Sequence, residues 1–113
     1  MNTVISLKLN TQFQRLYKKG AAAVRPSLVM YARHNGQNRC RLGITAGKKS
    51  GKAVVRNRAK RRLRELYRSS LPRLKSGYDI VLVARGITAS TDFSRLSADF
   101  FAAAKKCGVL TDD

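Results

Sequence analysis

Apolar residues along this chain alternate between the spacing of an amphipathic helix and that of a buried strand. In residues 10–19 they recur three and four positions apart, which places them on one face of a helix. Asn10 is a candidate N-cap and Gly20 a candidate helix end. The pattern predicts a short helix with one aromatic face.

Three later segments are predicted as strands because they are rich in β-branched and aromatic residues. Residues 28–33 and 40–45 flank the turn-forming sequence HNGQN, and an antiparallel hairpin is the simplest interpretation. A short extra strand is considered near Val24. Residues 78–85, YDIVLVAR, are apolar over most of their length, as expected of a central strand.

Two longer segments have helical patterns. The apolar stripe of residues 52–69 consists of Val55, Ala59, Leu63, Leu66 and Tyr67. Residues 90–110 have cap candidates from Ser90 to Asp92, a basic last turn, and Gly108 as a stop. Because the first of these helices lies between two predicted strands, a βαβ unit is expected there.

The order of elements, α-β-β-(β)-α-β-α, contains no internal repeat. It predicts an α+β fold, a single-domain sandwich in which helices pack on one small mixed β-sheet. A chain of 113 residues with 43% hydrophobic content is expected to form one domain, residues 1–113. Residues 109–113 are expected to be a flexible tail.

The charge of the chain is strongly one-sided. It has 24 Lys and Arg against 6 Asp and Glu, a formal net charge of +18, which predicts a polyanionic partner. Nucleic acid is favoured over a membrane surface, because no large apolar residues accompany the charge. No apolar run reaches the roughly 18 residues of a membrane span, and the N-terminus does not resemble a signal peptide, so a cytoplasmic protein is expected.

Much of this charge falls on the second predicted helix. Between residues 56 and 68 one acid, Glu65, accompanies seven bases, and four like-charged pairs at i, i+4 add about 1–2 kcal/mol of repulsion. A merely solvated face would interleave acids with the bases. Arginine, which predominates, binds phosphates bidentately and stacks on bases. The candidate RNA-binding residues are Lys48, Lys49, Lys52, Arg56, Asn57, Arg58, Lys60, Arg61, Arg62, Arg64 and Arg68.

The lysines among them belong to the sequence GKKSGKA, between a strand and the start of the basic helix. Helix N-termini favour phosphate, so these lysines would reinforce an anion site. The sequence is one residue too short for a Walker A loop, and Ala53 stands where that motif needs Ser or Thr. Nucleotide hydrolysis is therefore disfavoured.

Candidate catalytic and metal-binding residues are sparse. The acids are scattered singly apart from the last two residues, and Cys40 and Cys107 lack metal-ligand spacing and are expected as reduced core thiols. His34 is predicted in a loop. No cofactor is expected on the protein alone. Phe13, Tyr17 and Tyr31 are either a stacking platform for single-stranded nucleotides or ordinary core, and spacing does not decide between them.

The stretch GKKSGKAVVRNRAKRRLREL resembles the bacterial ribonuclease P protein family, whose signature is an R-N-R-x-K-R-x-x-R-E helix behind a basic K-K-x-G-x-A-V segment. The matching positions are Arg56, Asn57, Arg58, Lys60, Arg61, Arg64 and Glu65. LKLNTQFQRLYKKG and YDIVLVAR also resemble family segments, so the likeness covers nearly the whole chain. Two positions depart from the family pattern, Tyr17 in place of Phe and Gly47 in place of Ser.

The resemblance implies a subunit of an endoribonuclease that removes the 5′ leader of precursor tRNA, with the catalytic RNA and precursor tRNA as partners. It implies that hydrolysis belongs to the RNA and to Mg²⁺ held through it, and that the βαβ crossover is left-handed. The leader cleft that it implies is lined by Phe13, Tyr17, Val29, Tyr31 and Thr45, with Lys48 and Lys49 at the rim. The alternatives are a structural RNA-binding protein of ribosomal type and a self-sufficient nuclease using Glu65 or Asp79.

Overall fold

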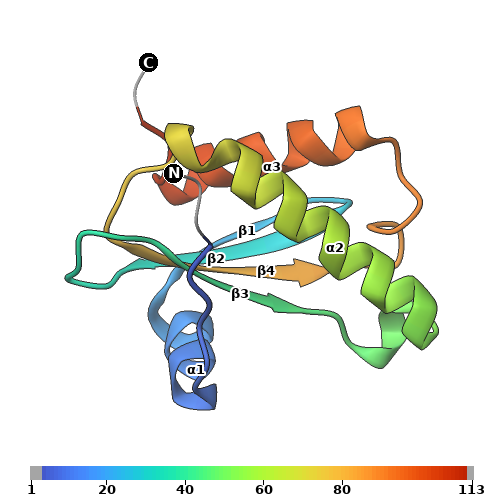
Figure 1. Ribbon diagram of the computed structural model, residues 1–113, viewed down its shortest axis with the longest axis horizontal. Coiled ribbons are helices and arrows are strands. Elements are labelled where there is room, and N and C mark those ends of the chain that lie inside the picture. The colour runs from blue at the N-terminus through green and yellow to red at the C-terminus, as the bar shows by residue number, and fades with distance from the viewer. Residues whose placement is uncertain (1–3, 112–113) are drawn as a thin grey trace.

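A four-stranded sheet separates one helix from the other two (Figure 1). The structure is a computed structural model and describes residues 4–111. The elements are α1 (Asn10–Lys19), β1 (Ala21–Val24), β2 (Leu28–His34), β3 (Arg41–Thr45), the 3-10 helix η1 (Lys48–Ser50), α2 (Ala53–Ser70), the 3-10 helix η2 (Leu71–Arg73), β4 (Tyr78–Ala84) and α3 (Phe93–Cys107). The predicted α+β class and element order are confirmed, including the short strand at Val24.

The strand order is β1-β2-β4-β3, with β4 antiparallel to β2 and parallel to β3. The predicted hairpin of β2 with β3 is therefore wrong, because β4 lies between them. Residues 80–82 are completely buried, so β4 needs a neighbour at each edge and cover on each face. Viewed from the side of α2 with β3 and β4 pointing up, β4 lies to the left of β3, so the β3–α2–β4 crossover is left-handed (Figure 1).

The main core lies between the sheet and the two helices α2 and α3. Ile80 and Leu82 of β4 pack there with Leu63 of α2 and Phe100 of α3, and all four are fully buried. The predicted stripe of α2 is confirmed from Ala59 onward. Val55, however, is 37% exposed, because the first turns of α2 extend past the end of the sheet (Figure 1).

Helix α1 covers part of the opposite face, where Leu16 packs with Val81 and Leu7. Asn10 is its first residue rather than its N-cap. The cap position is Leu9, and the side-chain oxygen of Gln12 accepts the backbone N–H groups of Lys8 and Leu9 at 3.1 and 3.0 Å. Gln12, in the first turn, thus satisfies the N–H groups of the cap position and of the residue before it.

Gly20 ends α1, as predicted, for a steric reason. A Cβ at this position would lie 2.7 Å from the carbonyl oxygen of Leu16 and 2.9 Å from that of Ala32. Only glycine allows α1 to pass directly into β1 so close to β2.

Both ends of the described chain are held against the fold. Leu42 of β3 donates its N–H to Ile5 at 2.7 Å and accepts the N–H of Leu7 at 2.8 Å, so the N-terminal segment covers part of the edge of β3. Residues 109–111, expected as part of a flexible tail, are held in place instead: Val109 is fully buried, Leu110 bridges to Leu74, and Thr111 donates its N–H to the carbonyl of Arg73 at 2.8 Å. The remainder of that predicted tail lies outside the described residues.

Cys40 and Cys107 are free and buried, which confirms the prediction of core thiols. Burial raises the pKa of both, that of Cys107 to about 11. Neither thiol is therefore a thiolate near neutral pH.

Asp99 on α3 ties that helix to the turn between β1 and β2. Its carboxylate accepts hydrogen bonds from the N–H and hydroxyl of Ser27 at 3.1 and 2.6 Å, and pairs with Arg25 at 3.3 Å. Burial alone would raise the pKa of Asp99, but these contacts outweigh it and hold the pKa below its usual value.

We expect Asp99→Asn to lower the free energy of unfolding at pH 7 by about 1.5–3 kcal/mol, the range for hydrogen bonds to a charged partner. Because the folded pKa is depressed, this contribution is complete above the ordinary Asp pKa of about 3.9 and is lost as the pH falls through the folded value. Urea unfolding at pH 7 and at about pH 3 should show the difference from wild type shrinking in acid. Asp92→Asn, an exposed position at the start of α3, is the control, and a loss equal at both pH values would contradict the assignment.

Candidate nucleic-acid interface

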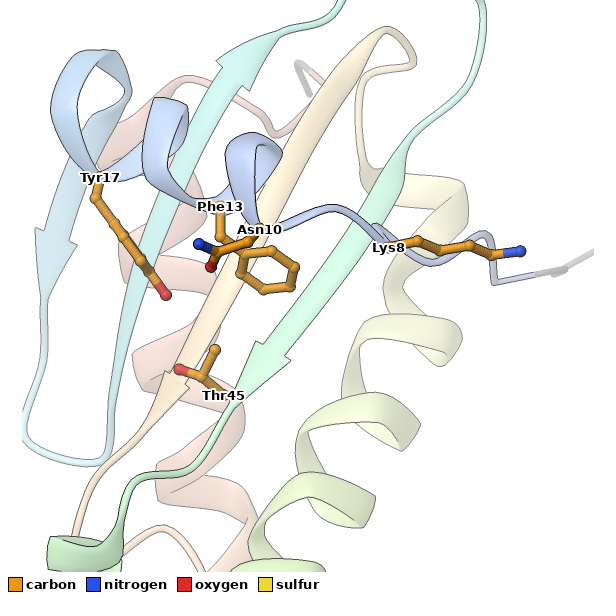
Figure 2. Close-up of a pocket in the computed structure, with 5 residues that line it drawn as sticks. All are labelled: Lys8, Asn10, Phe13, Tyr17 and Thr45. Atoms are coloured by element: carbon orange, nitrogen blue, oxygen red, sulfur yellow. The ribbon is translucent and has the colours of Figure 1, made fainter.

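An open hollow of about 300 Å³ lies between α1 and the sheet. Lys8, Asn10, Phe13, Tyr17 and Thr45 line it, and Figure 2 shows Phe13 and Tyr17 reaching from α1 over the strands toward the level of Thr45. The hollow thus has an aromatic wall from one helix and a polar floor from one strand.

The strand register explains which sheet residues reach this face. Tyr31 of β2 and Gly43 of β3 flank Val81 of β4, and in the next row Val29 and Thr45 flank Val83. Side chains of one cross-strand row share a face. Under helix α1, Gly43 and Val81 of the first row are buried and Tyr31 is partly exposed, whereas all three residues of the second row are only partly buried. All five residues expected in the leader cleft therefore lie at this face of the sheet, and three of them, Phe13, Tyr17 and Thr45, line the hollow.

The sequence interpretation missed Lys8 and Asn10, which line the hollow, and two residues of the sheet beside it. Val83 lies in the row of Val29 and Thr45, and its signal was the two-residue alternation with Val81 along β4. Gly43 lies under the ring of Phe13: a Cβ there would come within 2.5 Å of Phe13 Cε2. The missing side chain lets the ring lie against the sheet.

The aromatic side chains pack against a core and are also partly accessible at the surface. The rings of Tyr17 and Tyr31 meet edge to face, with centroids 5.0 Å apart and an interplanar angle of 73°. Phe13, Tyr17 and Tyr31 all pack against the small core of Leu7, Leu16 and Val81, yet each remains partly exposed. They are held in place by the core while part of each ring surface stays accessible.

The lysine-rich turn is η1 together with Gly51 and Lys52. Ser50 is buried and donates its hydroxyl to the carbonyl of Ala84 at 3.2 Å, which fixes the turn beside the end of β4. Lys48, Lys49 and Lys52 are all exposed. The turn therefore presents its cations at the edge of the sheet where β3 ends and α2 begins.

Helix α2 extends this cationic surface along its length. The exposed members are Asn57, Arg58, Arg61, Arg64 and Arg68, while Arg56 and Lys60 are partly buried on the flank of the apolar stripe. Arg68 pairs with Glu65. The remaining exposed arginines form no ion pair within residues 4–111.

Arg62 differs from the other candidate RNA-binding residues. Its Nη1 and Nη2 donate to the carbonyl oxygens of Thr88 and Thr91 at 2.8 and 2.7 Å, and its Cζ lies 5.8 Å from the ring centroid of Phe93. The guanidinium is thus directed at the segment before α3.

Arg85, the last residue of the predicted strand 78–85, is a further exposed cation that is not among the candidate RNA-binding residues. Because β3 and β4 are parallel, their carboxyl ends lie at one edge of the sheet, so Arg85 shares that edge with the lysine-rich turn. Only the pairing of the two strands brings these cations together.

His34 ends β2 and stacks on Tyr78 with centroids 4.2 Å apart, outside the cleft lining.

The acids of the described chain are separated and mostly bound to arginine. Arg41 holds Asp79 with two hydrogen bonds of 2.8 Å, and Asn35 donates a third at 2.9 Å. Within residues 4–111, no group of three His, Cys, Asp or Glu side chains could hold a metal ion. In the same range, no helix is long and apolar enough to cross a bilayer.

The family model for ribonuclease P matches residues 1–108. The ribonuclease P protein component of Natranaerobius thermophilus is 36% identical over 110 residues, covering 97% of this chain and 96% of the relative. That of Caldanaerobacter subterraneus is 44% identical over 90 residues, covering 80% and 78%.

Solved structures agree with this assignment. The Staphylococcus aureus RNase P protein superposes with a TM-score of 0.83 at 30% identity, covering 96% of this chain and 100% of that one. The Thermotoga maritima RNase P protein gives a TM-score of 0.77 at 31% identity, covering 86% and 92%. The chain therefore belongs to the family of ribonuclease P protein components, the protein subunits of the ribonuclease P holoenzyme.

Proposed function

We propose that this chain binds the catalytic RNA of ribonuclease P through α2 and the lysine-rich turn, and binds the single-stranded 5′ leader of precursor tRNA in the cleft beside α1. It thereby assists endonucleolytic removal of the leader in the cytoplasm. The observation that carries this proposal is the pairing of two surfaces on one small domain: a row of exposed arginines and a half-exposed aromatic cleft.

Each surface suits a different feature of RNA. The exposed cations of α2 and Arg85 can neutralise phosphates of a folded RNA, which removes their mutual repulsion. The rings of Tyr17 and Tyr31 are accessible to unstacked bases. Such rings can stack on a leader of any sequence, because every base has a π face. Lys48 and Lys49 of the lysine-rich turn follow Thr45 at the same end of β3, so the turn that binds the catalytic RNA can also contact leader phosphates beside the cleft.

In this proposal hydrolysis belongs to the RNA. The acids of the described chain are engaged individually with Arg25, Arg41 and Arg68 apart from Asp92, so the chain's own role is to bind and orient. Mg²⁺ held by the RNA would supply the Lewis-acid chemistry that activates a water. The exposed cations of this chain lower the repulsion between catalytic RNA and substrate, so fewer free Mg²⁺ ions are needed for their association.

Cleavage of precursor tRNA tests whether the RNA performs the hydrolysis and the protein assists it. We expect the protein alone to leave the precursor intact, and the catalytic RNA at low Mg²⁺ to cleave it much faster once the protein is added. Product should be measured on gels over time, with mature tRNA as competitor, because leader binding favours precursor over product. Cleavage by the protein alone, or no effect on the RNA, would refute the proposal.

Leader binding should depend on the aromatic side chains. Phe13→Ala and Tyr31→Ala are each expected to weaken affinity for a precursor with a long leader by at least about fivefold, since one stacked base contributes about 1–3 kcal/mol. Affinity for a precursor with a one-nucleotide leader should hardly change. Tyr31→Phe, which keeps the ring, and Gln14→Ala, an exposed position on α1, are matched controls. Equal affinity of all variants for long leaders would instead support a structural RNA-binding protein.

Gly43 provides a test that removes no cleft side chain. In Gly43→Ala the added methyl group would overlap the ring of Phe13, which must swing into the hollow. We expect weaker binding of long leaders and unchanged binding of the catalytic RNA, measured by fluorescence anisotropy with each labelled RNA. Unchanged leader affinity would show that Phe13 does not contact the leader.

A further inference from the structure

Arg62 lies on the basic helix, yet the structure uses its charge inside the protein. Both terminal nitrogens face backbone carbonyls, those of Thr88 and Thr91, at hydrogen-bond distance. An arginine binds a phosphate with the same bidentate geometry, through both terminal nitrogens. Within residues 4–111 no carboxylate pairs with Arg62, so two backbone oxygens and the ring of Phe93 complement its charge there.

The segment that Arg62 holds is itself tied to the rest of the fold. Thr88 is fully buried, and its hydroxyl donates to the carbonyl of Ser27 at 2.6 Å and accepts the N–H of Arg85 at 2.7 Å. Ser27 in turn binds Asp99 on α3. A chain of polar contacts therefore runs from the middle of α2 to α3 through residues 85–91.

This connection joins the two helices on one face of the sheet, α2 and α3, which pack on different strands. Helix α2 packs on β3 and β4, whereas α3 packs on β1 and β2. Apolar packing on a sheet resists separation of a helix more than it resists rotation, because it has little directionality. Hydrogen bonds from a guanidinium are directional, so those of Arg62 define how α2 is turned relative to its neighbours.

We infer that Arg62 is a positioning residue: it binds the segment before α3 and so orients the exposed cations of α2 relative to Arg85, without itself contacting RNA phosphate. This inference rests on the proposed function of α2 as the surface for catalytic RNA. It removes Arg62 from the predicted RNA-binding residues and gives it a separate task.

The dependence of RNA affinity on salt separates a positioning residue from a phosphate ligand. The variants are Arg62→Met, which keeps the apolar stem, Arg62→Lys, which keeps the charge, and Arg58→Met, a matched control one turn earlier on the exposed face. Affinity for the catalytic RNA is measured over a series of salt concentrations, at a temperature where circular dichroism shows every variant folded.

For Arg58→Met we expect the slope of log K against log salt to become less negative by about 0.7–0.9, the value of one phosphate contact. For Arg62→Met we expect roughly tenfold weaker binding, which is the effect of losing one charge-assisted contact. The slope should stay unchanged. Arg62→Lys should bind as weakly as Arg62→Met, since one ammonium group cannot reproduce the two hydrogen bonds that the guanidinium donates to Thr88 and Thr91.

Two results would overturn the inference. A slope change in Arg62→Met, with recovery in Arg62→Lys, would make Arg62 a phosphate ligand. Full affinity in folded Arg62→Met would leave it a purely structural residue. Failure of the proposed function is distinguishable, because wild-type protein would then bind the catalytic RNA without a steep salt dependence and Arg58→Met would leave the slope unchanged.

Discussion

Strand β4 can be buried on both faces only if helices cover both sides of the sheet and strands pair with both of its edges. Residues 80–82 are inaccessible to solvent, so β2 and β3 must lie on either side of it, although they are neighbours in sequence. The side chains of β4 then alternate between the main core under α2 and α3 and the small core under α1. Because α1 covers only one row of its face, the adjacent row of Val29, Val83 and Thr45 remains open as the floor of the cleft.

The distribution of charge follows from how few acids the chain has. Asp79 and Asp99 each bind an arginine and neutral donors in structural positions, and they hold the sheet and α3 in place. Only Glu65 lies on the basic helix, where it pairs with Arg68. The acids therefore stabilise the fold and leave most of the cations of α2 uncompensated, so that surface is relieved of repulsion when RNA phosphates approach. Under the proposed function, stability and RNA binding therefore use separate charges.

The parts of the fold that were predictable are those governed by local spacing. Residues 10–19 are a helix with those bounds, and the helix around Leu63 has the predicted apolar face from Ala59 onward. The pairing of strands was not predictable in the same way. HNGQN is a good turn sequence, but burial of β4 is worth more than a local hairpin, so the longer-range arrangement prevails. Val55 shows the same limit, because helical spacing cannot reveal where the sheet below ends.

The sequence by itself determined the chemistry of this protein: a polyanion partner from the net charge, the basic helix from its periodicity, and the family from the R-N-R motif. Only the tertiary structure decided which of these residues act together. Gly43 under Phe13 and Arg85 beside the lysine-rich turn are neighbours through strand pairing, and Arg62 is turned inward by carbonyls about thirty residues further along the chain. The physical reason is that spacing along a chain reports which side of an element a residue occupies, whereas its contacts depend on what the fold places opposite.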